Sequence, residues 1–500
     1  MSKQQISPLS TEELEEYWAT IAEKIEWFKP YKQVIDKSIV PIPQWFVGGQ
    51  MNTCHNALDR HVNAGRGKNI ALIYDSDMTG ERQQYSYQML LEATTTFAGA
   101  MARQGIGKGD RVIIYMPMIP QAIIAMLACA RVGAIHSVIY GGTAVEELAS
   151  RMEDTKAKLV ITASCGLKSG QIVEYKPIID EAIDQTIHQP DLCVVLQRQH
   201  VNSPLKFGRD HNWFDFIADA VPQDCVHVEA TDPLYIIYAS GVMGKQKGLI
   251  RDNGGHAVEL NWTMTSIYNL ELNDVFWASS DISCIVGHSY LVYGPLFNGA
   301  TTILYEGKQG NSLDAGAFLR IIDEYKVTYL LTDIKALETI KAENLVAEKL
   351  QTHNFSSLKS IYLTGDKCKE NTLLWYKNTL NIPIIDHWWQ TETIWPIAAV
   401  NNLDCGNFKP NPTAVSRAIP GWNVQVLDSN GIPTNGGETG EIVCRLPLPP
   451  ASLVNQWNAE TYFIESHFSV YPGFYKTGDT GYVDDNGQII IVTRFCNIVI

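Results

Sequence analysis

The chain has 500 residues, of which 45% are hydrophobic and 19% charged. This balance supports a large buried core and argues against disorder. The formal net charge is −15 with no long basic run, which disfavours nucleic acid and anionic membranes as main partners. The ten scattered cysteines form no C-x-x-C pair, as is typical of reduced thiols in a cytoplasmic protein. No signal peptide and no apolar run of about 18 residues is present, so we expect no membrane span.

The first 65 residues predict a helix followed by an irregular aromatic arm. Ser10 or Thr11, supported by Glu13, is typical of a capped helix start, and Trp18 and Ile21 follow at helical spacing. Aromatic residues then recur at 27–30 and 45–49, a pattern that predicts an arm lying against a core.

An alternation of strands and helices begins near residue 70. Strand-like runs occupy 71–74, 111–115, 135–140 and 158–162, and helix-like runs occupy 87–102, 119–132 and 146–154. This rhythm predicts a parallel sheet with helices packed on it.

A glycine-rich segment follows the buried-strand pattern at 235–238. It contains Ser240, Gly241, Gly244, Lys247 and Gly248. Glycines let backbone N–H groups turn toward an anion, and lysine supplies a mobile charge for phosphate. The string is not a Walker A loop, and alone it is as typical of a structural strand-to-helix turn as of a phosphate site.

A second alternating run extends to about residue 404. Its strand-like segments are 276–278, 301–305, 328–331, 360–363 and 382–385, and 315–325 and 371–380 are helix-like. From 405 to 493 Pro and Gly become frequent among short alternating runs, such as 424–427 and 442–445. We therefore predict an α/β fold with paired sheet subdomains over 66–404 and a smaller β-rich subdomain over 405–493. The chain then stops within apolar residues, as if it were cut.

Polar residues follow the apolar strand at 382–385, where α/β proteins bind ligands. Glu392 can hold Mg²⁺ beside phosphate oxygens, and Thr391 can donate to a phosphate. The tryptophans Trp388 and Trp389 can wall an apolar pocket. Taken alone, the segment is equally compatible with a core aromatic pair flanked by capping residues.

Two weaker signals accompany it. Asp479, in the string Y-K-T-G-D-T-G-Y at 475–482, suits bidentate acceptance from ribose hydroxyls, although a simple Gly-Asp turn explains the string too. A helix start at Gly287 would place His288 beside an anion, although a lone histidine is more often structural.

Together these segments resemble the AMP-forming acyl-CoA synthetases of the adenylate-forming superfamily. The resemblance is strongest to the propionate–CoA ligases, with the acetate–CoA ligases next. It covers nearly all 500 residues and includes W-F-K-P at 27–30, N-T-C at 52–54, D-R-H-V at 59–62, R-D-N-G-G-H at 251–256 and L-P-L-P-P at 446–450.

The resemblance implies that ATP and a short carboxylate give an acyl-adenylate, from which coenzyme A displaces AMP. It implies catalytic roles for Lys247, Thr391 and Glu392, with Mg²⁺ at Glu392. It places Val286 and Trp389 in the acyl pocket and coenzyme A near Gly141 and Gly142. The nucleotide-binding residues that it implies are Ser240, Gly241, Gly244, Lys247, Gly365, Asp366, Lys367, Asp386, His387, Trp388, Trp389, Gln390, Thr391, Asp479 and Arg494.

The chain departs from this family where the chemistry is expected. Ala239, Val242 and Met243 replace three hydroxyl residues of the phosphate loop, and Cys496 takes the position of a hinge aspartate. Residues 494–500 would begin the hinge, and the small C-terminal domain would be absent, so we expect impaired adenylation. The alternatives are a non-catalytic protein that still binds a nucleotide or acyl-adenylate, and an acetate–CoA ligase. The oligomeric state is left open.

Overall fold

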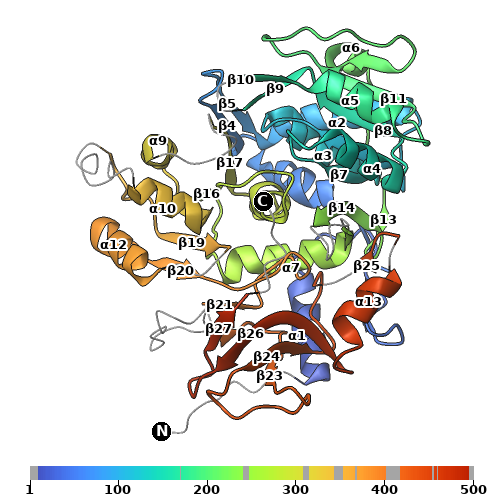
Figure 1. Cartoon of the computed structure of the whole chain (residues 1–500). Coiled ribbons are helices and arrows are strands. Elements are labelled where there is room, and N and C mark those ends of the chain that lie inside the picture. The colour runs from blue at the N-terminus through green and yellow to red at the C-terminus, as the bar shows by residue number, and fades with distance from the viewer. Residues whose placement is uncertain are drawn as a thin grey trace.

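The computed structural model describes residues 10–168, 171–239, 247–307, 315–342, 353–365, 369–400, 417–452, 455–458 and 460–494. Two large sheets and one smaller antiparallel sheet make up its body (Figure 1). The predicted α/β class, with parallel sheets and a β-rich flank, is confirmed.

The first large sheet has eight strands, of which the first six in spatial order are parallel, the seventh is antiparallel to the sixth and the eighth is antiparallel to the seventh. In spatial order they are β12 (Asp210–Asn212), β11 (Leu192–Leu196), β8 (Leu159–Ala163), β6 (Arg111–Tyr115), β7 (Ile135–Val138), β14 (Pro233–Ala239), β15 (Lys247–Asp252) and β25 (Asn455–Gln456). Strand residues alternate between two cores, with Val112 and Ile114 in one and Ile113 and Tyr115 in the other. The first core contains α2 (Tyr87–Arg103) and α3 (Pro120–Val132), and the second contains α4 (Val145–Thr155) and α5 (Tyr175–Asp184).

The second large sheet has seven strands, all parallel except the last. In spatial order they are β20 (Ile384–Asp386), β19 (Ser360–Thr364), β18 (Tyr329–Asp333), β16 (Val275–Ala278), β17 (Thr301–Glu306), β4 (Ile70–Ser76) and β5 (Arg82–Ser86). One face carries α9 (Ala315–Tyr325), α10 (Ile334–Ala342) and α12 (Glu370–Leu380). The other face joins the large core, together with α7 (Asn253–Ser266), the π-helical η4 (Gly287–Tyr293) and α8 (Gly294–Phe297).

Strand β4 shows that the two sheets are not consecutive in the chain. The sequence pattern grouped residues 71–74 with the strands that follow them directly, but β4 lies beside β17, with Tyr74 opposite Leu304. A local period reveals a strand and not its partner, so this pairing was missed.

The β-rich flank contains an antiparallel sheet of β23 (Val424–Leu427), β24 (Gly440–Arg445), β26 (Phe474–Val483) and β27 (Ile489–Thr493), with α13 (Glu460–Phe468) beside it. Along β26 every second residue is buried, so that Tyr475, Thr477 and Asp479 face inward. The short strand β25 leaves this flank and pairs with β15 of the first large sheet.

The N-terminal helix α1 (Thr11–Ala22) begins with a complete capping box between Ser10 and Glu13, as predicted. Trp18, fully buried, packs edge-on against Trp262 and Trp395. The remaining elements are β1 (Gln33–Asp36), β2 (Gln44–Val47), β3 (Gln50–Met51), η1 (His55–Asp59), η2 (Val62–Arg66), β9 (Cys165–Lys168), β10 (Gln171–Glu174), α6 (Trp213–Ile217), β13 (Val228–Glu229), β21 (Ala398–Ala399) and β22 (Arg417–Ala418).

The glycine-rich segment joins two strands, not a strand and a helix as the sequence suggested. Strands β14 and β15 are antiparallel, with Ala239 opposite Lys247. Lys247 and Gly248 therefore lie in β15, and α7 begins only at Asn253, where the Asp252 side chain accepts from the His256 N–H. A Cβ at Gly248 would lie 3.0 Å from Ile236 and 3.1 Å from Trp457, so close packing of the hairpin explains this glycine.

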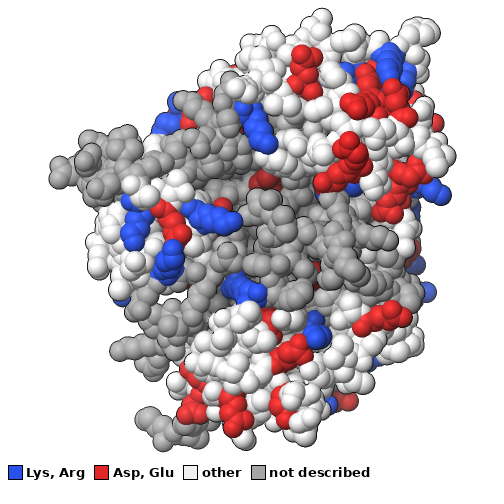
Figure 2. Space-filling model, in the orientation of Figure 1, with Lys and Arg blue, Asp and Glu red and all other residues white. Residues whose placement is uncertain are grey.

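Within the described ranges no helix has the length and apolarity to cross a membrane. On the face shown in Figure 2, acidic and basic side chains are interspersed over the described surface.

Candidate active site

A closed turn follows β20 and carries the residues predicted to meet phosphate and metal. The Trp388 N–H donates to the Ala398 carbonyl over 2.9 Å, which returns the chain toward β21. The Ile394 N–H donates to Gln390 over 3.0 Å, and the Gln390 N–H donates to the Thr393 hydroxyl over 3.1 Å. We call residues 388–393 the acidic turn. Thr391 and Glu392 at its tip are half-buried.

Strand β26 meets the acidic turn through Asp479. One oxygen of this buried carboxylate accepts from the Trp388 indole N–H over 2.7 Å and from the Gln390 amide over 3.2 Å. Gln390 also accepts from the Tyr475 hydroxyl over 2.8 Å. The two segments predicted from the sequence, 386–393 and 475–482, are therefore in direct contact.

The Glu392 carboxylate is the part of this turn that fits a metal ion. It is half-buried, and no hydrogen bond or ion pair to another described residue engages it. A carboxylate that is held close to solvent with its oxygens unengaged suits Mg²⁺, which takes oxygen ligands and keeps several waters. Glu392 also lies within electrostatic reach of Tyr475, whose pKa is raised mainly by burial and secondly by this carboxylate.

His387 and Trp388 are fully buried, which limits how they can meet a ligand. The Tyr268 hydroxyl lies 2.9 Å from His387 Nε2. Burial lowers the pKa of His387 to about 4, so the ring is neutral at neutral pH. Asp386, the last residue of β20, accepts from the His387 N–H over 2.9 Å.

Arg494, directly after β27, brings a cation to the same region. Its Nε and Nη2 are buried without a hydrogen-bond partner among the described residues, and its charge helps to lower the pKa of His387. Guanidinium nitrogens that are buried without hydrogen-bond partners are costly, so the half-buried Arg494 side chain suits an anionic ligand. Gly365 directly follows β19 at φ +91°, a conformation that favours glycine.

Several predicted residues lie outside the described ranges. These are Ser240, Gly241, Gly244, Asp366 and Lys367, the loop replacements Val242 and Met243, and Cys496. For Lys247 the structure describes only the backbone, at the start of β15.

The predicted acyl-pocket residues lie near an aromatic wall. The half-buried Trp389 ring lies 5.2 Å from the Tyr290 ring and 5.3 Å from the His387 ring, measured between centroids. Val286 precedes η4, four residues before Tyr290, and is half-buried against the same core. The helix η4 and the acidic turn therefore meet at Trp389.

Gly141 and Gly142, predicted near coenzyme A, have a structural explanation of their own. A Cβ at Gly141 would lie 2.0 Å from the buried Tyr175 hydroxyl. The Gly142 N–H donates to the Tyr115 hydroxyl over 3.1 Å, and its φ is +130°. Contact with coenzyme A remains a prediction.

His288 takes the structural role that was the alternative interpretation. It is fully buried and stacks on His136, with centroids 5.7 Å apart. Burial lowers its pKa to about 4. Its burial favours the structural interpretation, and the anion site at Gly287 stays a prediction.

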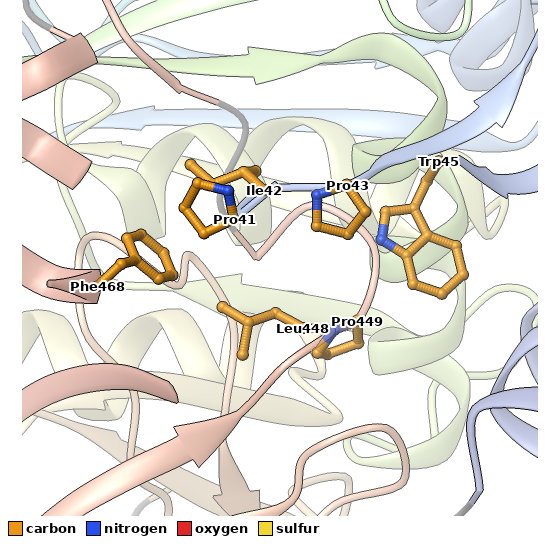
Figure 3. A pocket seen from close by; sticks show the side chains of 7 residues that line it. All are labelled: Pro41, Ile42, Pro43, Trp45, Leu448, Pro449 and Phe468. Atoms are coloured by element: carbon orange, nitrogen blue, oxygen red, sulfur yellow. The ribbon is translucent and has the colours of Figure 1, made fainter. Parts of the chain in front are cut away.

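A separate pocket lies between the N-terminal arm and the β-rich flank (Figure 3). Its lining is apolar and consists of Pro41, Ile42, Pro43, Trp45, Leu448, Pro449 and Phe468. Its volume of about 10 Å³ is near the minimum that holds one water. It contains none of the predicted site residues and cannot accommodate a nucleotide.

Comparisons with known proteins show the family of the chain. The family model of the AMP-binding enzymes matches residues 58–449, and that of the acetyl-coenzyme A synthetase N-terminus matches residues 4–57. The mitochondrial acyl-CoA synthetase short-chain family member 3 of Rattus norvegicus is 43% identical over 487 residues, covering 97% of this chain and 71% of that protein. The propionate–CoA ligase of Escherichia coli is 36% identical over 509 residues, covering 100% of this chain and 79% of that protein.

The chain belongs to the AMP-forming short-chain acyl-CoA synthetases. As a member of this family it is an acyl-CoA ligase whose substrates are ATP, coenzyme A and a carboxylate, with Mg²⁺ as cofactor. The solved acetoacetyl-CoA synthetase from Streptomyces lividans shares the fold, with a TM-score of 0.86 at 22% identity over 97% of this chain and 73% of that one.

Sequence reasoning missed three side chains of this synthetase that contact the acidic turn or His387, the residue before it. Tyr268 on His387, Tyr475 on Gln390 and Arg251 on the backbone of the turn were not expected. Arg251 had a visible signal, because it directly follows the apolar residues Leu249 and Ile250.

Proposed function

We propose that the chain joins a short-chain carboxylate, with propionate preferred, to coenzyme A through an acyl-adenylate. The observation that supports the size limit is the aromatic wall. Trp389 lies between Tyr290 and His387 and is followed after one residue by Thr391 and Glu392. A bulky ring so close to the reacting groups leaves room for few carbon atoms.

The first step is attack of a carboxylate oxygen on the α-phosphorus of ATP, with pyrophosphate leaving. Like charges oppose this attack, so positive charge near the phosphates lowers the barrier. Glu392 would hold Mg²⁺, which offsets phosphate charge when bound. Thr391 would donate a hydrogen bond to the phosphate, and Arg494 and Lys247 would supply cationic charge.

The second step is attack of the coenzyme A sulfur on the acyl carbon. The carbon–oxygen bond to AMP breaks, AMP leaves, and the thiol proton is released to solvent. In this proposal Asp479 accepts from the ribose hydroxyls throughout, while its bonds to Trp388 and Gln390 keep it in place. Gly141 and Gly142 would lie near coenzyme A.

Acid profiling tests the substrate. We expect thioester formation and AMP release to be highest with propionate, lower with acetate and lowest with butyrate. Trp389→Ala should shift the preference toward butyrate, whereas Trp375→Ala on α12 should leave the order unchanged. Equal rates with all three acids, or a higher rate with acetate, would contradict the proposed preference for propionate.

The second candidate function is nucleotide or acyl-adenylate binding without turnover. It is favoured by Ala239, Val242 and Met243, which lack the hydroxyl donors expected in the phosphate loop. Calorimetric titration with ATP, AMP and a propionyl-adenylate analogue separates the two functions. Tight binding of a nucleotide or of the analogue, without thioester formation from any acid, would support the second candidate function.

We infer a cytoplasmic location from the ten scattered cysteines, which are typical of reduced thiols. The name of the rat relative places that protein in mitochondria. Fractionation of cells that express the chain is the test, and recovery in an organelle would contradict the inference.

A further inference from the structure

We propose that Arg251 is a positioning residue, which fixes the acidic turn so that Glu392 is directed toward the metal ion. The inference rests on the proposed function and adds a residue to it. Arg251 lies on β15 and is 1% exposed. Its Nη2 donates to the carbonyl oxygens of Thr391 and Glu392, each over 2.9 Å, and its Nη1 donates to the Ile250 carbonyl over 2.7 Å.

The two carbonyls are those on either side of Glu392. The Thr391 carbonyl belongs to the peptide plane before this residue, and the Glu392 carbonyl belongs to the plane after it. Since peptide units are planar, fixing both carbonyls fixes the two backbone dihedral angles of Glu392. The direction of the Cα–Cβ bond, from which the Glu392 side chain extends, then follows from one guanidinium.

Packing alone does not explain an arginine at this position. No ion pair joins Arg251 to a carboxylate within the described part of the chain, and its Nε is buried without a partner there. Burial lowers the pKa of Arg251, while Tyr235 and the carboxylates of Glu392, Asp252 and Glu259 act in the opposite direction. Burying a cation is costly unless it is paired and hydrogen-bonded, and two of the three hydrogen bonds of Arg251 go to the acidic turn.

Arg251 also connects two parts of the predicted site. Lys247 starts the same strand four residues earlier, about 13 Å away along an extended chain. The hairpin expected to contact phosphate and the turn expected to hold metal are thus parts of one hydrogen-bonded unit. A shift of β15 would move both.

Calorimetric titration of the full chain with ATP, with Mg²⁺ and with EDTA, tests this role without requiring turnover. Arg251→Met removes both donors, and we expect about a 10- to 100-fold loss of ATP affinity with Mg²⁺, as for other groups that orient metal ligands. With EDTA the affinity should change less than about twofold, because Glu392 then holds no metal. Arg251→Lys, which keeps the charge with one donor group, should fall between.

Arg131→Lys is the matched control. Arg131 is 3% exposed and donates to Asp59 and to the Gln223 carbonyl, away from the acidic turn. We expect it to lower the melting temperature without changing the effect of Mg²⁺ on ATP affinity. Two results with Arg251→Lys, or with a folded Arg251→Met, would overturn the positioning role. In the first, Mg²⁺ raises the ATP affinity of the variant as much as that of the unaltered chain. In the second, the variant loses ATP affinity equally with Mg²⁺ and with EDTA.

The same titration separates this inference from the proposed function. An unaltered chain that binds no ATP, or binds it without regard to Mg²⁺, overturns the proposed function and the role of Arg251 with it. An unaltered chain with Mg²⁺-dependent binding that survives Arg251→Met overturns the role of Arg251 alone.

Discussion

Asp479 is one of the residues through which the β-rich flank holds the acidic turn. It is 2% exposed and accepts from both the Trp388 indole and the Gln390 amide. The inward direction of this carboxylate follows from the alternation of β26, in which Tyr475 and Thr477 share the same face. A carboxylate placed there supports the turn even before any ribose binds.

Asp479→Ala should therefore impair both stability and nucleotide binding. The substitution leaves the buried indole N–H of Trp388 without an acceptor, which lowers the free energy of unfolding by about 1–3 kcal/mol. Urea unfolding and calorimetric AMP titration measure the two effects. Asp484→Ala, in the turn after the same strand, removes only bonds to the N–H groups of Asn486 and Gln488 near solvent and should leave AMP affinity unchanged. Equal AMP affinity in both variants would contradict this account of Asp479.

Glu259 makes stability depend on pH. Burial raises its pKa from the ordinary 4.5 to about 8, so between these values the folded chain keeps a proton that the unfolded chain releases. The contribution of Glu259 to the free energy of unfolding is therefore fully retained below about pH 4.5 and is lost as the pH rises through 8. Thr263 donates to this carboxyl group, and Arg251 and Tyr290 lie near it.

Glu259→Gln removes this titration, so its stability curve should be flatter between pH 4.5 and 8 and higher at pH 8, by about 1 kcal/mol or more. The slope does not vanish, because burial also raises the pKa of Asp252, to about 7. Urea unfolding across this pH range is the measurement. A curve parallel to that of the unaltered chain would show that Glu259 does not titrate in this window.

At the scale of elements, the sequence predicted most helices and strands but not how the glycine-rich hairpin ends. The capping box of α1 and the bounds of β6 and α9 were read from local pattern. The strand β15 was missed because a glycine-rich loop in an α/β chain is usually followed by a helix. Here a second strand lies between the loop and α7. The side chains that hold the acidic turn come from other elements, and a local pattern contains no information about them.

Helix α1 tests how strongly one element depends on its buried face. Trp18→Ala should lower the free energy of unfolding by about 3–5 kcal/mol, because it removes a fully buried ring from contact with Trp262 and Trp395. Ser10→Ala, which removes only the cap, should cost about 1 kcal/mol. Denaturant unfolding compares them, and equal losses would mean that α1 is not held by its tryptophan.

At the scale of the whole molecule, one buried ion pair joins the two large sheets. Arg198, after β11, contacts Glu306, the last residue of β17, over 2.9 and 3.1 Å. Glu306 also accepts from the Tyr74 and Ser76 hydroxyls of β4. The pairing of β4 with β17 joins residues about 230 positions apart and was not predictable from local pattern.

Breaking this pair should weaken the assembly of the two sheets. Arg198→Met leaves Glu306 buried without its cation and should cost about 3 kcal/mol. The double variant with Glu306→Gln should be less destabilised than the sum of the single variants, because it leaves no unpaired charge. Urea unfolding of all four proteins gives the coupling, and purely additive losses would show that the pair is energetically unimportant.

The central claim is that the acidic turn, Asp479 and Arg494 surround one adenylate. A crystal structure of the chain with a non-hydrolysable propionyl-adenylate analogue tests it most directly. We predict the phosphate beside Thr391, the ribose at Asp479 and the propionyl group against Trp389. An analogue bound elsewhere, or one whose phosphate lies far from Glu392, would contradict the account.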